Sequence, residues 1–399
     1  MKVLLAHNHY RSSSPSGEDA VFRNERQLLI DNGSDVISYE RFNDDIDESS
    51  FEKRVKLALD GAWSRQSYKD ISALIRKHRP TIAHFHNTFP QISPSAYKAC
   101  QDNGVPVVQT LHNYRFICPA AVLMRDGKPC EECIGTSLLP ALRHRCYRGS
   151  LAATGAQVWT IASNRWRGTY RNQVNRYIAL TQFAARKLAA GGLPGGRIEV
   201  KPNFLPEAPP AGKGEGGYAV YVGRLSEEKG VRTLLTAWKE IPGLPLKILG
   251  DGPLRQAMET QARQDGLDVE FLGFRAREDI LDIVGQGALQ IVPSEWYEGF
   301  PMVILEAYAC GTPVVASRIG SLEEIIVEDK TGVKFEAGNI KDLAEKVNAM
   351  WADKGKLGLM RHNARMVFDQ NYTDEKNFAH LMGIYQRAIE DFKSRGEKR

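Results

Sequence analysis

PSEWYEGFPMVILEA, at residues 293–307, is the stretch of this sequence that decides the fold. It follows the apolar run LQIVP, so a buried strand is expected to end in a polar loop. Pro301 suits the first turn of a helix, and Glu306 then falls on an otherwise apolar helix. Because a buried acid needs a hydroxyl or cation partner, the stretch predicts a ligand site where a strand ends.

Short apolar runs alternate with segments of helical period on both sides of this stretch. The runs in the N-terminal half lie at 3–7, 36–40, 81–86 and 105–112, and those in the C-terminal half at 218–223, 246–249, 269–273, 289–293 and 313–317. Two successive βαβ series predict an α/β protein with two doubly wound parallel sheets. The Pro- and Gly-rich segment 202–217 separates the series and is the expected linker. The length of 399 residues also favours two domains.

Two further strand-to-helix junctions in the C-terminal half have the chemistry of a phosphate site. The loop GRLSEEKG at 223–230 offers Arg224 and Lys229, and backbone N–H groups at a helix start can join them in neutralising phosphate oxygens. The turn GDGP at 250–253 has glycines that allow close approach. Each segment alone could be a solvated or generic turn. Together they favour a diphosphate, because ligands of open α/β sheets sit beyond the carboxyl ends of strands.

From about Tyr218 to Tyr372 the sequence resembles the retaining glycosyltransferases of glycosyltransferase family 4, also called glycosyl transferases group 1. The resemblance rests on Glu298 and Glu306, with Gly299-Phe300-Pro301 between them, and on the GRLSEEKG, GDG and GTPVVAS segments in the correct order. These enzymes have the GT-B fold, in which two Rossmann-like domains face each other across a cleft.

The resemblance implies a division of labour between the domains. Residues 1–205 would bind the acceptor, and residues 206–373 would bind the nucleotide-sugar donor. The C-terminal helix at 374–399 is expected to cross back onto the N-terminal domain, as it does in similar proteins. The domains would then be discontinuous in sequence.

The resemblance also implies roles for single residues. Arg224 and Lys229 would bind the donor diphosphate, Glu306 the ribose hydroxyls and Glu298 the hydroxyls of the donor sugar. His112 ends a strand where the family has its active-site histidine, although Asn113 follows it where Asp is common. The predicted catalytic residues are His112, Arg224, Lys229 and Glu298, and the predicted donor-binding residues are Gly17, Gly223, Arg224, Lys229, Gly252, Phe274, Glu298, Gly299, Phe300 and Glu306.

Some details of the N-terminal half stay open. The loop around Gly17 has one glycine where the family usually has a pair, and the resemblance implies that the role of the loop is kept. His84 and His86 alternate with apolar residues on a predicted strand, and both packing and an acceptor-site role fit them. No carboxylate stands out as a nucleophile, and the mechanism consistent with the resemblance is front-face attack, with the departing phosphate taking the acceptor's proton. The resemblance implies a nucleoside-diphosphate sugar as the donor, and this scheme requires no catalytic metal.

Four of the six cysteines crowd into one stretch. Cys118, Cys130, Cys133 and Cys146 include a CxxC pair, and in a cytosolic chain this favours a structural zinc site over disulfides. Packed free thiols and redox or disulfide chemistry are the alternatives. Zinc here would hold a loop in place and take no part in catalysis.

Charge is unevenly spread along the chain, although the formal net charge is only +5. Between Cys133 and Ile198 there is no Asp or Glu, and basic residues are interleaved with aromatic ones. The residues concerned are Arg143, Arg145, Tyr147, Arg148, Trp159, Arg165, Trp166, Arg167, Tyr170, Arg171 and Arg176. This composition suits an anionic membrane surface or the diphosphate of a lipid-linked acceptor. A solvated basic helix and a nucleic-acid patch are the alternatives, and nucleic acid is the less favoured partner.

The predicted function is transfer of a hexose to a lipid-linked or polysaccharide acceptor in surface glycan biosynthesis. The sequence shows no signal-peptide core and no apolar run of about 20 residues, so a cytoplasmic protein at the inner face of the membrane is expected. A nucleotide-sugar epimerase or phosphorylase on the same fold, and a catalytically idle membrane-binding scaffold, are the alternatives.

Overall fold

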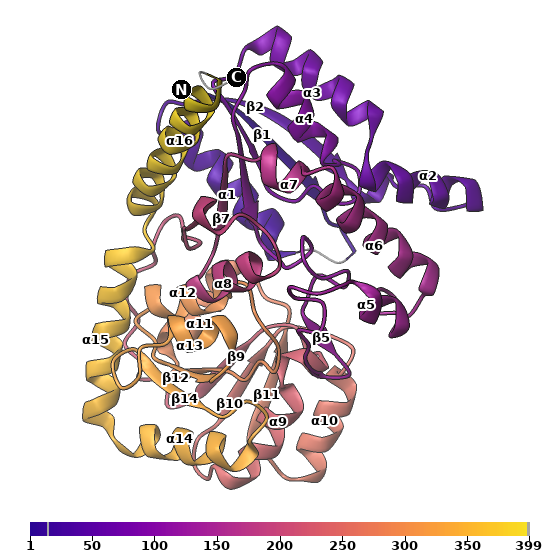
Figure 1. The fold of residues 1–399 in the computed structure, drawn as a ribbon. Coiled ribbons are helices and arrows are strands. Elements are labelled where there is room, and N and C mark those ends of the chain that lie inside the picture. Colours follow the sequence, from indigo (N-terminus) through magenta and orange to yellow (C-terminus); the bar gives the residue numbers. More distant parts are fainter. Residues whose placement is uncertain (14–15, 397–399) are drawn as a thin grey trace. The chain divides into compact units, whose positions relative to one another are not determined.

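The computed structural model describes residues 1–13 and 16–396 (Figure 1). The chain divides into two compact units. The first comprises Met1–Leu123, Glu131–Asn203 and the chain from Asn377 onward, and the second comprises Met124–Cys130 and Phe204–Lys376. Both units are therefore discontinuous in sequence.

The first unit is built on a six-stranded sheet in the order β2-β1-β3-β4-β7-β8. All its pairings are parallel. The strands are β1 (Lys2–His9), β2 (Asp35–Phe42), β3 (Ile82–Phe85), β4 (Val107–Leu111), β7 (Arg176–Ala179) and β8 (Ile198–Val200). The helices are α1 (Gly17–Asp31), α2 (Phe51–Ala62), α3 (Arg65–His78), α4 (Ser95–Asp102), α5 (Leu139–Arg143), α6 (Leu151–Trp166), α7 (Thr169–Asn172), α8 (Gln182–Ala190) and most of α16 (Asp374–Gly396), with 3-10 turns η1 (Asn43–Asp45) and η2 (Gly195–Arg197).

The second unit is built on another parallel six-stranded sheet, in the order β11-β10-β9-β12-β13-β14. Its strands are β9 (Ala219–Val222), β10 (Leu246–Leu249), β11 (Val269–Gly273), β12 (Leu289–Val292), β13 (Val314–Ser317) and β14 (Gly332–Phe335). Its helices are α9 (Val231–Ala237), α10 (Arg255–Gln264), α11 (Arg277–Gln286), α12 (Met302–Ala309), α13 (Gly320–Ile325), α14 (Ile340–Ala352) and α15 (Lys354–Asn371), with turns η3 (Glu227–Lys229) and η4 (Trp238–Glu240). A short antiparallel hairpin, β5 (Met124–Arg125) and β6 (Lys128–Pro129), also belongs to this unit.

The strand orders fix where ligands can bind. In the second unit the order reverses between β9 and β12, and in the first unit it reverses between β1 and β3. At such a switch point the connections leave in opposite directions, which opens a crevice at the carboxyl ends of the two strands. The prediction of two doubly wound parallel sheets is confirmed.

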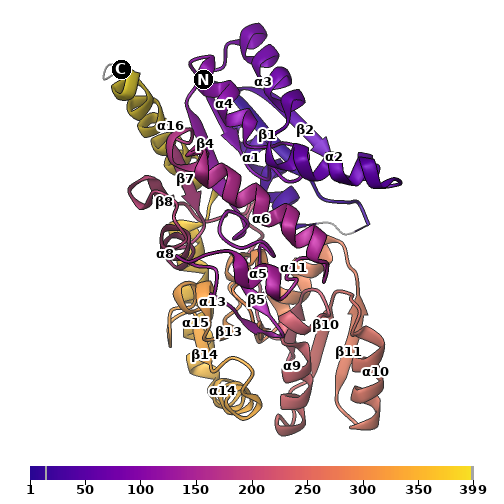
Figure 2. The ribbon, with the colours of Figure 1, turned by 45° about the vertical axis from the view of Figure 1, so that its right-hand side comes forward.

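Helix α16 completes the core of the first unit. Leu381, Ile384, Tyr385 and Ala388 are fully buried in one cluster with side chains of the sheet, among them Leu5 of β1. The spacing of these four residues follows the helical period, so one apolar face of α16 covers the sheet (Figure 2).

Candidate active site

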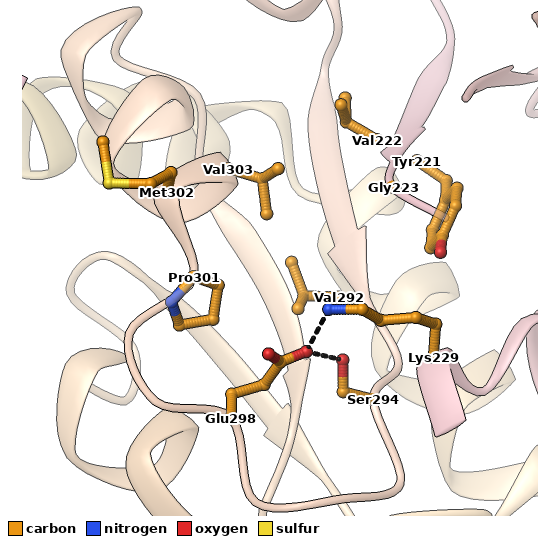
Figure 3. Close-up of a pocket in the computed structure, with 10 residues that line it drawn as sticks. All are labelled: Tyr221, Val222, Gly223, Lys229, Val292, Ser294, Glu298, Pro301, Met302 and Val303. Carbon is orange, nitrogen blue, oxygen red and sulfur yellow. Dashed lines mark hydrogen bonds and ion pairs between the residues drawn. The ribbon is translucent and has the colours of Figure 1, made fainter. Parts of the chain in front are cut away.

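The second unit has a pocket at its switch point, between the carboxyl ends of β9 and β12. Figure 3 shows the side chains that line it. They are Tyr221, Val222, Gly223, Lys229, Val292, Ser294, Glu298, Pro301, Met302 and Val303. Three of the predicted donor-site residues, Gly223, Lys229 and Glu298, therefore meet in one pocket.

Glu298 is the polar centre of this pocket. Lys229 Nζ donates to Glu298 Oε1 at 2.6 Å, and Ser294 Oγ donates to the same oxygen at 2.8 Å (Figure 3). Glu298 is only 6% exposed, whereas the Lys229 side chain is 26% exposed. Since a buried carboxylate needs a counter-charge, Lys229 is held in the pocket, and part of its side chain stays exposed.

Glycines allow the loops that follow β9, β10 and β12 to approach one another closely at the pocket. Gly230 has φ +65°, and a Cβ built there would lie 1.9 Å from the carbonyl oxygen of Pro293. Gly250 approaches the carbonyl oxygen of Gly223 in the same way, with 2.0 Å for its Cβ. A backbone hydrogen bond of 2.9 Å from Glu295 N to Glu228 O joins the loops that follow β12 and β9. The glycines of the GRLSEEKG and GDGP segments are thus required by packing.

The other residues predicted to bind the donor do not line this pocket. Arg224 is exposed, and Phe274 is 83% exposed. Glu306 is partly buried on α12, and this burial raises the pKa of its carboxyl. Gly252, Gly299 and Phe300 also lie outside the lining, and a Cβ at Gly252 would lie 2.4 Å from the carbonyl oxygen of Leu225. Their roles toward a donor remain predictions.

The first unit has a second pocket, near its own switch point. It is lined by Glu18, His86, Asn87, Thr88, Gln109, Thr110, Leu111, His112, Asn113, Arg115 and Phe116. The predicted catalytic histidine, His112, follows β4 directly and is partly exposed. Nε and Nη1 of Arg115 are buried without a hydrogen-bond partner in the described part of the chain. Gly17 starts α1, where Ser16 Oγ accepts a hydrogen bond from Glu18 N at 3.2 Å, and it does not line the pocket.

His112 belongs to a buried polar network. His86 Nδ1 and His112 Nε2 are 2.9 Å apart, and His86 Nε2 and Glu25 Oε1 are 2.9 Å apart. Glu25 Oε1 also lies 3.0 Å from His84 Nδ1, while Glu25 Oε2 accepts from Lys201 Nζ at 3.0 Å. Burial lowers the pKa of His86 to about 4, and burial together with His86 lowers that of His112 well below its usual value. Both rings are therefore neutral near pH 7.

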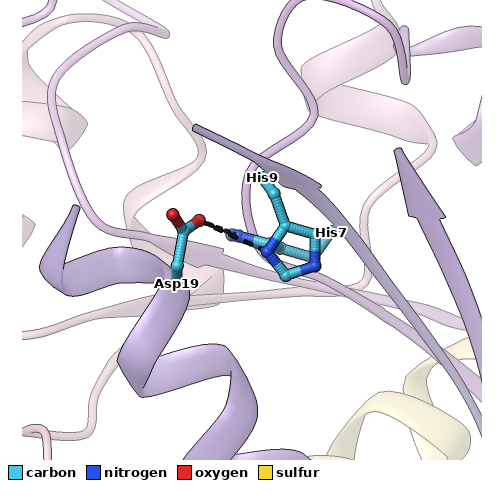
Figure 4. A group of neighbouring side chains, drawn as sticks. All are labelled: His7, His9 and Asp19. Carbon is cyan, nitrogen blue, oxygen red and sulfur yellow. Dashed lines mark hydrogen bonds and ion pairs between the residues drawn. The ribbon is translucent and has the colours of Figure 1, made fainter. Parts of the chain in front are cut away.

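Two groups of side chains in the described residues have ligand atoms close enough to hold a metal ion. One consists of His7, His9 and Asp19 (Figure 4), and the other consists of Glu25, His84 and His86. In the first, the Asn87 N–H donates to His7 Nδ1 at 3.3 Å, which leaves the proton on Nε2, facing Asp19 at 2.7 Å. A metal-ligating histidine instead donates its second N–H. In the second, the Lys201 ammonium would repel a cation.

The four clustered cysteines do not form such a group. Cys133 and Cys146 pack with Leu138, Ala141 and Ile161 in a small apolar cluster of the first unit. Cys118 also belongs to the first unit, and Cys130 belongs to the second. Among the described residues the cysteines form no disulfide. The structural zinc site therefore stays a prediction, and packing is the role that the geometry of Cys133 and Cys146 supports.

Several residues in or beside the two pockets were not predicted from the sequence. Ser294 lies inside the quoted stretch, but a serine in a loop carries no signal of its own partner. Glu25 is an acid on the buried face of α1, beside Phe22 and Leu29, and that misplaced charge was an available signal. His86 was left between packing and function, and its contact with His112 ties it to the pocket.

Two family models together cover most of the chain. The model described as Glycosyltransferase Family 4 matches residues 29–207, and the model described as Glycosyl transferases group 1 matches residues 208–367. The chain belongs to glycosyltransferase family 4. This confirms the resemblance found in the motifs.

Individual relatives agree with this assignment. An uncharacterized glycosyltransferase of Methanocaldococcus jannaschii, MJ1178, is 34% identical over 44% of this chain and 49% of its own length. The match spans less than half of the length of each of the first curated relatives. Among solved structures, Anabaena Alr3699/HepE in complex with UDP is similar with a TM-score of 0.65 and 19% identity, over 99% of this chain and 100% of that one. The lipopolysaccharide outer core galactosyltransferase WaaB is similar with a TM-score of 0.63 and 18% identity, over 98% and 99%. These structures establish the GT-B fold.

Proposed function

We propose that this protein transfers a hexose from a nucleoside-diphosphate sugar to an acceptor hydroxyl with retention of anomeric configuration. The observation that carries the proposal is the Lys229 ammonium held over the buried Glu298 in a pocket at the switch point of the second unit. Lys229 can neutralise the leaving diphosphate, and Glu298 can accept hydrogen bonds from sugar hydroxyls. That HepE has been solved with UDP and with UDP-glucose supports this class of donor.

The proposed reaction needs no protein nucleophile. The bond between the anomeric carbon and the phosphate oxygen breaks, and the acceptor oxygen forms the new bond on the same face. The acceptor's proton passes to the departing phosphate oxygen. The protein contributes by positioning both substrates and by stabilising the charge that develops on the diphosphate.

A donor panel tests this proposal. The protein is incubated with UDP-, GDP- and ADP-hexoses and a membrane or glycan extract, and the release of nucleoside diphosphate and the anomeric coupling of the product are measured by NMR. We expect one donor to be used, with an unchanged anomeric configuration in the product and with activity that survives a chelator. Free epimerised nucleotide sugar as the only product would support the epimerase alternative, and an inverted product would refute retention.

We also propose that the acceptor is a lipid-linked or polysaccharide glycan, and that the protein binds it at an anionic membrane surface. Helices α2 and α6 of the first unit pack against each other and can be followed in Figure 2. They carry large exposed apolar side chains, namely Phe51, Val55, Leu59, Leu151, Trp159 and Trp166. Exposed arginines accompany them, namely Arg143, Arg145, Arg148, Arg167 and Arg171. Apolar side chains with basic neighbours suit the headgroup region of an anionic bilayer.

Two arginines of the basic stretch are excluded from this surface. Arg165 Nη2 donates to the carbonyl oxygen of Gly191 at 3.0 Å, and Arg176 pairs with Glu199 and Asp391. Their charges are used inside the first unit. Within the described residues, no helix combines the length and apolarity that a membrane span requires.

Vesicle sedimentation tests the membrane surface. Binding to vesicles with an anionic lipid is expected to exceed binding to neutral vesicles and to weaken with salt. Reversing Arg167 and Arg171 to Glu should reduce it strongly, while Lys341→Glu, a change at an exposed residue of α14, should affect it much less. Equal losses in both variants would indicate a general charge effect and would contradict a defined surface.

A further inference from the structure

We propose that Glu25, acting through His86, fixes the ring of His112 in one neutral tautomer, so that His112 presents a hydrogen-bond acceptor to its pocket. Glu25 is a positioning residue in this scheme, because it contacts His86 and not the pocket. The hydrogen-bonded order is Lys201, Glu25, His86, His112, and we call this series the relay. These residues come from four separate parts of the first unit.

Lys201 sets the direction of hydrogen-bond donation in the relay. Its ammonium donates to Glu25 Oε2 at 3.0 Å and to Asn377 Oδ1 at 2.9 Å. Burial would raise the pKa of Glu25, but Lys201 with His84 and His86 outweighs it and holds that pKa well below the usual range. Glu25 is therefore ionised, and an ionised carboxylate can only accept hydrogen bonds.

The Glu25 carboxylate then determines which nitrogen carries the proton, first in His86 and then in His112. Since Glu25 Oε1 accepts, His86 must carry its proton on Nε2, and in a neutral ring Nδ1 is then an acceptor. His112 must accordingly donate from Nε2 to His86 Nδ1. Because His112 is also neutral, its Nδ1 carries no proton. Within the described residues, no hydrogen bond joins His112 Nδ1 to another group.

The tautomer limits what the pocket can bind at His112. A group that meets Nδ1 must bring its own hydrogen, as the hydroxyl of a neutral sugar does. A carboxylate or phosphate oxygen brings none and would be repelled there. If the proposed transferase function holds, on which this step rests, His112 selects a sugar hydroxyl and rejects an acidic substituent at the same place.

The tautomer can be measured in the free protein, without any substrate. We expect 15N NMR of histidine-labelled protein, assigned with a His112→Asn variant, to show His112 protonated at Nε2 and unprotonated at Nδ1 at pH 7. A proton on Nδ1, or an averaged mixture of both forms, would overturn the relay. This result is independent of whether the protein transfers a sugar.

The variant Glu25→Gln should reverse the relay. The Lys201 ammonium would hold the amide oxygen, so that the amide NH2 group would face His86 Nε2, and each ring would shift its proton. His112 would then carry a proton on Nδ1. We expect the preference for a neutral donor sugar over the corresponding uronic acid to fall roughly tenfold, because Nδ1–H can donate to a carboxylate oxygen as well as to a hydroxyl.

The matched control is Tyr385→Phe. Tyr385 OH lies 2.7 Å from His84 Nδ1, in the same buried region but off the path to His112. We expect this variant to keep the native tautomer of His112. If Tyr385→Phe shifts the tautomer as Glu25→Gln does, the effect is structural and the relay is refuted. If Glu25→Gln does not fold, the spectrum of the unsubstituted protein decides alone. An active enzyme with the wrong tautomer contradicts only the relay, and the right tautomer in an inactive protein contradicts only the function.

Discussion

The two units share one plan but place different chemistry at the ends of their strands. Each has a six-stranded parallel sheet with a pocket near the switch point. In the second unit the polar centre is a single ion pair, Lys229 with Glu298, whose cation is partly exposed. In the first unit it is a buried network of neutral histidine rings and carboxylates. The same topology thus holds an ion pair in one unit and neutral histidine rings in the other.

The distribution of histidine makes the contrast sharper. Of the nine histidines, His362 belongs to the second unit and is exposed, and the other eight belong to the first. His7, His84 and His86 of the first unit are buried beside carboxylates, so their hydrogen bonds are determined by buried partners. The second unit can respond to a ligand by exchanging one ion pair. The following predictions test this contrast, from the largest expected effect to the smallest.

Acid should destabilise the first unit before the second. Burial, the largest cause, lowers the pKa of His7 and of His86 from 6.5 to about 4. The unfolded rings take up protons as pH falls from 6.5 to 4 while the folded rings do not, so stability is lost over this window, by about 3 kcal/mol for each ring. Urea unfolding at pH 7 and pH 4.5, followed by hydrogen exchange in β1 and β9, measures the difference.

Two variants control the acid experiment. His7→Gln should remove about one third of the pH dependence, because His86 and His112, whose pKa values burial also lowers, are still present. His362→Gln, at an exposed position of α15, should leave it unchanged. Loss of protection in β9 before β1 would contradict the contrast between the units.

Removing the cation of the second pocket should abolish most donor turnover. Lys229→Met takes away the ammonium that we propose to neutralise the leaving diphosphate, and kcat/KM is expected to fall at least a hundredfold, about 2.7 kcal/mol. The control is Arg232→Met, since Arg232 is an exposed cation of α9 paired with Glu227. A change of less than tenfold in Lys229→Met would exclude Lys229 as a diphosphate ligand.

A methyl group at Gly230 should disrupt the loop contact of the second pocket. Gly230→Ala meets the Pro293 carbonyl oxygen at 1.9 Å and keeps a positive φ, so we expect a loss of about 2 kcal/mol in unfolding free energy. Gly358→Ala is the matched control, because nothing lies within 4 Å of its Cβ on α15. That variant should be neutral or more stable by about 0.5–1 kcal/mol. Equal effects in chemical denaturation would show that the close approach is unimportant.

The smallest expected effect is that of Ser294. Ser294→Ala removes one of two hydrogen bonds to Glu298 Oε1 and should lower kcat/KM about fivefold, or about 1 kcal/mol. Ser226→Ala removes a comparable hydroxyl that donates to Glu228, outside the pocket lining, and should change kcat/KM less than twofold. A larger loss at Ser226 would move the functional centre away from Glu298.

The sequence predicted the second pocket better than the first. Lys229 and Glu298 each lie in a short segment with a recognisable local pattern, a strand end followed by a helix start, and the sheet order then brings the segments together. The pocket of the first unit depends on groups without such a pattern. His112 was predicted because the family has its histidine at this strand end. The burial of Glu25 could be expected from Phe22 and Leu29 near it, but its contact with His86 could not, and neither could the contacts that Arg165 and Arg176 make within the first unit.

The sequence by itself determined the two parallel α/β sheets, the loops that line the pocket of the second unit and the family. It could do so because strand and helix periods, glycine turns and paired motifs are local, with few residues between the parts that matter. Only the tertiary structure decided that Ser294 and Lys229 share one oxygen of Glu298, and that Lys201, Glu25, His86 and His112 form one line. Lys201 and Glu25 are 176 positions apart, and His86 and Glu25 are 61 apart. Contacts at such separations arise from packing, and packing determines which ring nitrogen carries the proton.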